Sequence, residues 1–139
     1  MGTINVKSAS QVAQEKYEAT FSGAIRAIDQ AADEARKKLI TAITAQPETY
    51  REKWLEVLEY RETSAEGEYL TAEATRRGIT VLSLVQEIEA TRAQWTTVNA
   101  GVEAERVGGK DDVRDAADVA GIEAAREDAV ASIWSKVPA

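Results

Sequence analysis

The chain has 139 residues, a formal net charge of −7 and a hydrophobic fraction of 44%. It contains neither cysteine nor histidine, which excludes disulfides and thiolate zinc sites and removes the commonest general base and metal ligand. No stretch approaches the ~20 apolar residues of a membrane span. Residues 1–6 show no cationic segment before an apolar one, so we expect no signal peptide.

The acidic excess lies after residue 45, and it disfavours binding to nucleic-acid phosphates or to anionic membranes. Two interpretations stay open. The acidic side chains keep helix surfaces soluble, or they imitate nucleic acid and occupy a basic partner.

Residues 8–45 carry an apolar seam that steps by three and four. The seam consists of Tyr17, Phe21, Ala24, Ile28, Ala31, Ala35, Leu39 and Ala42. This spacing predicts one helix about 55 Å long at 1.5 Å per residue, with Ser8 or Ser10 as its N-cap. A rod of this length buries a one-sided stripe only against another helix.

We therefore expect residues 1–45 to be an oligomerisation segment, because alanine-rich seams suit close pairing of helices. The predicted interaction residues are Tyr17, Phe21, Ala24, Ile28, Ala31 and Ala35. Residues 46–139 are expected to form a helical bundle region with bends near 64–67, 78–79 and 108–109.

Within that region, Pro47 is well placed as the first residue of a second helix. Its apolar stripe includes Tyr50 and Trp54, which we predict to be core residues, together with Trp95 later in the chain. The charged residues between them are expected to form a solvated outer face with surface ion pairs. Its acidic members are Glu52, Glu56 and Glu59.

A short helix then ends at Gly78, a natural left-handed stop. Thr80 caps a third, long helix whose seam runs from Val81 through Trp95 to Val102, with Thr91 or Arg92 between. Gly108 and Gly109 are predicted to interrupt this helix. Asp118 caps a last helix, which Pro138 ends.

No segment alternates with a period of two over the length of a strand. The predicted fold is therefore all-α, an elongated helical bundle of coiled-coil-like hairpins with long first and third helices.

Trp134 lies five residues from the C-terminus of the sequence, where helices fray. Two interpretations stay open for this side chain. It is tucked onto a neighbouring helix, or it is an interaction residue that anchors another subunit, a role that tryptophan favours.

The chain offers no pattern of catalytic residues. Carboxylate-bridged metal sites in helical bundles use Glu-x-x-His pairs, which a chain without histidine lacks. Gly108-Gly109-Lys110 is too little to indicate a phosphate-binding loop. We therefore expect a protein that is not an enzyme and has no catalytic residue, no cofactor, no metal and no small-molecule substrate.

One stretch resembles small helical proteins of tailed bacteriophages and prophages, which are often encoded near tail-fibre and tail-assembly genes. The resemblance begins with the segment from Tyr69 to Val81, of the form L-x-x-E-A-x-x-x-G-hydroxyl-apolar. An Ile-containing helix ending near Trp95 follows, then a Val-Glu-Ala-x-Arg segment at 102–106 and an acidic-capped terminal helix from Asp118. It covers residues 69–134 and departs from the pattern at Gly108-Gly109.

The resemblance implies a tail- or tail-fibre-associated structural or accessory protein that acts by helix–helix association in the virion. Its partners would be further copies of itself and other phage structural proteins, in the virion or in the host cytoplasm during assembly. The alternatives are a cytosolic scaffold or chaperone absent from the mature particle, and the acidic nucleic-acid mimic.

Overall fold

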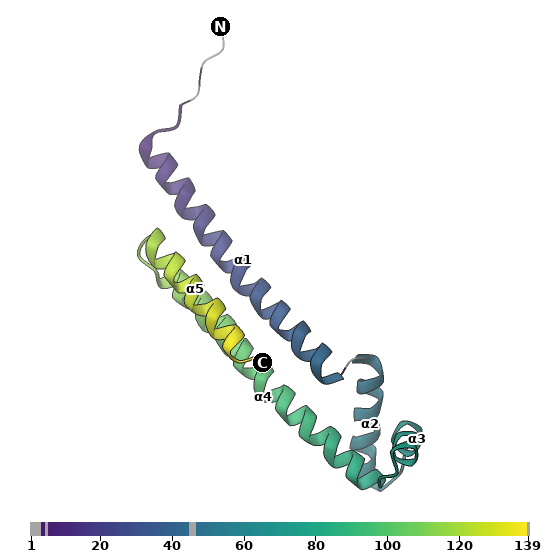
Figure 1. Cartoon of the computed structure of the whole chain (residues 1–139). Helices are drawn as coiled ribbons and strands as arrows, with labels where there is room; N and C mark the ends of the chain where they lie inside the picture. Colours follow the sequence, from purple (N-terminus) through teal and green to yellow (C-terminus); the bar gives the residue numbers. More distant parts are fainter. Residues whose placement is uncertain (1–3, 5, 45–46, 139) are drawn as a thin grey trace. The chain divides into compact units, whose positions relative to one another are not determined.

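The computed structural model describes residues 4, 6–44 and 47–138, and the fold of this part of the chain is all-α. Its helices are α1 (Ala9–Thr44), α2 (Pro47–Thr63), α3 (Glu68–Arg77), α4 (Val81–Asp115) and α5 (Val119–Ser135) (Figure 1). No strand occurs in these residues, so the predicted all-α fold class is confirmed. The two long helices expected from the sequence are α1 and α4, the second of which follows Thr80.

The helix ends follow the capping residues that the sequence suggests. Ser8 Oγ accepts from Gln11 N at 3.2 Å, and Asp118 Oδ1 accepts from Gly121 N at 2.7 Å. Gly78 ends α3 in the left-handed conformation at φ 69° and ψ 32°, where a side chain would be strained. The predicted end of the first helix at Ala45 lies outside the described residues.

The chain divides into two compact units. Unit 1 combines the residues up to Ala35 with those from Gly101 onward, and unit 2 is Arg36–Ala100. Each unit therefore draws on both sides of residue 45, the boundary expected from the sequence. No helix of the described residues is long and apolar enough to cross a bilayer.

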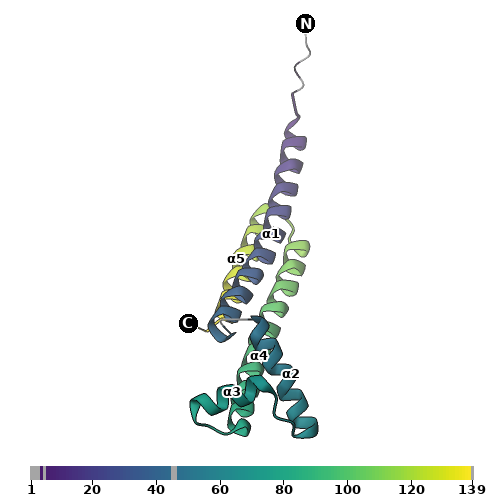
Figure 2. The ribbon, with the colours of Figure 1, turned by 90° about the vertical axis from the view of Figure 1, so that its right-hand side faces the viewer.

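In unit 1, the part of α1 up to Ala35, the part of α4 from Gly101, and α5 lie side by side (Figures 1 and 2). Half of their buried residues are alanines, and the others are isoleucines and valines. The set is Ala24, Ile28, Ala31, Ala32, Ala35, Val102, Val113, Ile122, Ala129 and Ile133. Small side chains permit close approach of helices, because little volume separates the backbones.

The predicted interruption at Gly108-Gly109 is wrong, because α4 continues through both residues to Asp115. A Cβ at position 109 would overlap the Cβ of Ala129 on α5 and lie 3.6 Å from Ile28 Cδ1 on α1. Gly109 is therefore the point where three helices meet, and its missing side chain is needed for packing. Nothing lies within 4 Å of the corresponding position at Gly108.

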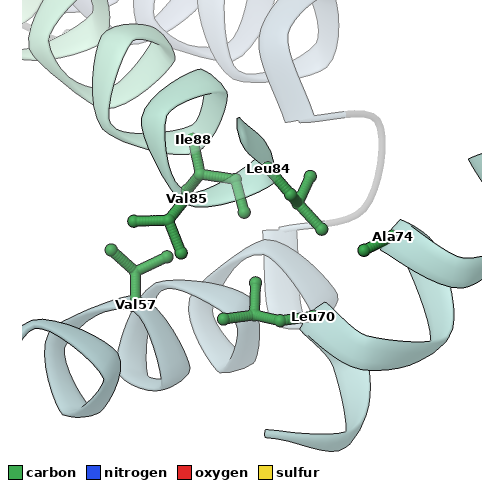
Figure 3. Packing of buried hydrophobic residues seen from close by; sticks show 6 residues of the cluster. All are labelled: Val57, Leu70, Ala74, Leu84, Val85 and Ile88. Atoms are coloured by element: carbon green, nitrogen blue, oxygen red, sulfur yellow. The ribbon is translucent and has the colours of Figure 1, made fainter. Parts of the chain in front are cut away.

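Unit 2 has a core of larger side chains. Val57 on α2, Leu70 and Ala74 on α3, and Leu84, Val85 and Ile88 on α4 form one buried cluster (Figure 3). Tyr50, Trp54, Tyr60, Ile79 and Val81 pack against it while remaining partly exposed. The three helices thus bury one face each against a shared centre.

Glu56 corrects the expectation of a purely solvated acidic face on α2. Its carboxylate accepts from Leu70 N at 3.0 Å and from Tyr69 N at 3.2 Å, so a residue of α2 caps the N-terminus of α3. Gly67, the N-cap residue of α3, makes no side-chain cap of its own, and a Cβ there would collide with the Glu56 carboxylate. The carboxylate satisfies backbone donors that the helix leaves open.

Candidate functional site

The predicted interaction residues of α1 divide into a buried and a half-buried group. Ala24, Ile28, Ala31 and Ala35 are 1%, 0%, 6% and 0% exposed, and Tyr17 and Phe21 are half-buried. The chain itself covers most of this seam, so its apolar character is explained without a second chain. The side chain of Ala42 lies outside the described residues, and oligomerisation through the seam stays a prediction.

The start of α1 is different, because nothing in the described part of the chain covers it. Every residue from Ala9 to Lys16 is exposed, including Val12 at 53%. We call Ala9–Lys16 the leading segment. It runs past the turn between α4 and α5 of the same unit (Figures 1 and 2). Lys7 Nζ bonds to Glu15 Oε2 at 2.7 Å, a contact that stabilises the segment locally.

Trp134 lies near the end of α5 and is 36% exposed, next to Ile133, which is fully buried. Its surface is thus partly covered and partly open. This arrangement fits the intramolecular interpretation for one part of the side chain and leaves area for a partner. The choice between the two interpretations stays a prediction, tested by association of a Trp134→Ala variant.

Ion pairs connect the helices within each unit. In unit 1, Asp29 on α1 accepts from Arg106 and from Lys110 on α4, both at 3.0 Å. Burial alone would raise the pKa of Asp29, but the hydrogen bonds and charges of these two cations outweigh it and lower that pKa. Asp29 thus pairs with both cations, and these contacts fix the position of α1 along α4.

Unit 2 has a longer network. Lys53 on α2 bonds to Glu73 on α3 at 2.7 Å, and Arg77 connects Glu73 at 3.1 Å with Glu87 on α4 at 2.8 Å. Burial would raise the pKa of Glu73, and the two cations lower it overall. This network holds the short helix α3 against both neighbours.

A cavity of about 150 Å³ lies in unit 2, among the end of α1, the start of α2 and the middle of α4. Its lining consists of Ile40, Pro47, Tyr50, Arg92 and Trp95. The Arg92 guanidinium carbon lies 4.3 Å from the centre of the Trp54 ring, a cation–π contact. The cavity therefore combines aromatic walls with one cation.

The hydroxyl of Tyr50 is buried and has no hydrogen-bond partner among the groups that the structure describes. Burial raises the pKa of Tyr50, and the nearby Arg92 charge opposes that shift. Arg92 is thus close to the hydroxyl without a well-formed hydrogen bond to it. A buried hydroxyl without a partner is costly, and such groups call for a specific explanation.

Sequence reasoning placed Tyr50 and Trp95 in the core and gave Arg92 only as an alternative seam residue. The available signal was the arginine at a seam position, three residues before Trp95 and on a face otherwise made of apolar residues. The sequence did not indicate that Trp54 would lie under the same guanidinium.

Groups of three or more acidic side chains placed to hold a metal ion do not occur in the described ranges. Comparisons with models of protein families, with curated proteins and with solved structures give no match for this chain.

Proposed function

We propose that the chain is a structural or accessory protein of a tailed bacteriophage, tail- or tail-fibre-associated, that acts by helix–helix association and catalyses no reaction. The setting rests on the resemblance of residues 69–134 to small helical phage proteins. The mode of action rests on the leading segment of α1.

The leading segment carries the proposal because it is helical without tertiary packing. In proteins, packing of an apolar face supplies most of the stability of a helix. Ala9–Lys16 has no such packing against the residues that the structure describes, and it presents Val12 and two alanines to solvent. A partner helix lying along these turns would continue the packing that begins at Tyr17.

The test is the composition of particles and tail intermediates purified from cells that produce the phage. Mass spectrometry should find the chain in the mature particle. Its presence in tail intermediates alone would favour the scaffold or chaperone. Its absence from both would contradict a tail-associated role.

Val12→Glu should reduce incorporation into particles at least tenfold, because a carboxylate in a helix contact is desolvated without a partner. Leu55→Glu is the matched control, since Leu55 is 49% exposed on α2, outside the leading segment. Both variants should retain the helicity of the original chain. Equal incorporation of the two variants would overturn the role of the leading segment.

A further inference from the structure

Arg92 differs from three other cations that link helices in unit 2. Lys53, Arg61 and Arg77 each bond to a carboxylate, at 2.7, 2.6 and 2.8 Å. Arg92 is half-buried, stacks over the Trp54 ring and lies near the Tyr50 hydroxyl. No carboxylate of the described part of the chain pairs with it.

In its stacked position, the Arg92 guanidinium does not use its strongest binding mode, which is a pair of N–H donors bonded to one carboxylate. Stacking on an aromatic ring occupies the face of the group, whereas its N–H donors lie along the edge. A fork of two edge donors matches the two oxygens of a carboxylate. The Tyr50 hydroxyl is a further polar group of the lining, and it has no hydrogen-bond partner among the residues described.

The remainder of the cavity suits an apolar group. Ile40, Pro47 and Trp95 contribute aliphatic and aromatic surface beside the guanidinium. The volume is about 150 Å³, and an apolar cavity of about that size in a protein core is known to hold benzene. The pocket is partly open to solvent, so a single ring or a short branched chain fits inside it and any further part of a ligand lies outside.

We infer that this cavity is a binding site for an apolar carboxylate, whose charged group pairs with Arg92 while its apolar group lies against Trp95, Pro47 and Ile40. Two sources share this chemistry, a free organic acid and the carboxylate end of another polypeptide. The inference is independent of the phage setting, since it uses only groups of unit 2.

Benzoate and benzamide are suitable probes for the full chain, because they share a shape and differ in charge. Benzoate should bind saturably at millimolar concentration and at least tenfold more tightly than benzamide. In NMR spectra, the indole N–H signals of Trp54 and Trp95 should shift, whereas that of Trp134 in unit 1 should not. Equal binding of the two probes, or no saturable shift, would overturn the inference.

Substitutions identify the cation that pairs with benzoate. Arg92→Gln should weaken benzoate binding at least tenfold, and Tyr50→Phe should weaken it less. Arg51→Gln is the control, because Arg51 is an exposed cation of α2 outside the lining and should leave binding unchanged. Equal losses for Arg92→Gln and Arg51→Gln would contradict the assignment. If Arg92→Gln loses helicity, the comparison of benzoate with benzamide on the original chain still tests whether the pocket binds a carboxylate.

A short peptide ending in phenylalanine with a free carboxylate distinguishes the two sources. Binding at least tenfold tighter than benzoate, and lost on amidation of the peptide, assigns the site to a polypeptide end. Binding equal to or weaker than that of benzoate assigns it to a small organic acid.

Discussion

The two units bury the apolar faces of their helices with different sets of side chains. Unit 1 packs its helices through buried alanines and Gly109 together with buried isoleucines and valines, and at Gly109 no room is left for a side chain. Unit 2 packs shorter helices around leucine, valine, isoleucine and aromatic side chains. Because of this difference, we expect the stability of the two units to respond differently to changes in side-chain volume. Added volume at Gly109 should damage unit 1, and removed volume in the cluster around Leu70 should damage unit 2.

The units also differ in how their helices are held at the ends. The ten-residue helix α3 of unit 2 is too short to be stable alone in water. It receives a cap from Glu56, an ion pair from Lys53 and a connection through Arg77 to α4. The long helices of unit 1 need fewer such devices, and Asp29 supplies the ion pairs between α1 and α4.

The largest expected effect comes from removing volume in unit 2. Leu70→Ala should lower the free energy of unfolding by about 2–5 kcal/mol, because Leu70 is fully buried and leaves a cavity. Urea denaturation followed by circular dichroism measures this loss. Leu55→Ala, at a site 49% exposed, should cost far less. Similar losses for the two variants would show that the Leu70 cluster is not the packing centre of unit 2.

Adding a methyl group to unit 1 should have effects of opposite sign at neighbouring positions. Gly109→Ala should destabilise by about 1–3 kcal/mol, because its Cβ overlaps that of Ala129. Gly108→Ala should stabilise by up to about 1 kcal/mol, since the space is open and alanine favours helix. Thermal unfolding of both variants gives the comparison. Stabilisation by Gly109→Ala would mean that α4 and α5 are not in close contact there.

The outcome at these glycines shows where sequence reasoning fails. Helix propensity treats Gly108-Gly109 as a break, because glycine is unfavourable in a helix interior. The structure places Ala129, twenty residues further on, against position 109, and this distant contact decides the conformation. A helix that must approach another closely tolerates glycine, and the linear sequence does not show which partner will be close.

Helix ends could be predicted from the sequence, because they depend on local contacts and not on distant ones. Pro47, Gly78 and Asp118 act on their own backbone or on residues three positions away, so local pattern suffices. Glu56 was not predictable, because its donors are thirteen and fourteen residues away on another helix. The cavity at Arg92 has the same character, since its lining comes from α1, α2 and α4.

The cap on α3 should have an intermediate effect. Glu56→Ala should destabilise by about 0.5–2 kcal/mol, the usual cost of losing a capping side chain, since Leu70 N and Tyr69 N lose their acceptor. Glu52→Ala, on the exposed face of the same helix, is the control and should change stability by less than about 0.5 kcal/mol. Hydrogen exchange at Leu70 N measures the local effect. Unchanged protection at Leu70 N in the Glu56 variant would contradict the capping role.

The smallest expected effect is a loss of folding stability at low pH, and it allows the two ion-pair networks to be compared. The pKa of Asp29 is lowered below its usual 3.8, and that of Glu73 below its usual 4.5. A carboxyl whose pKa is lower in the folded state stabilises the fold above its unfolded pKa. That contribution is lost as the pH falls through the lowered folded value.

The stabilisation from Glu73 should therefore begin to fall at a higher pH than that from Asp29. Asp29→Asn and Glu73→Gln should each flatten the loss of stability on acidification, by less than about 1 kcal/mol because both groups are partly exposed. Urea midpoints between pH 7 and pH 3 measure the change. The Glu73 variant should depart from the original chain first as the pH falls, since its reference pKa is higher. The reverse order would mean that unit 1, and not unit 2, depends more on its charged contacts near pH 4.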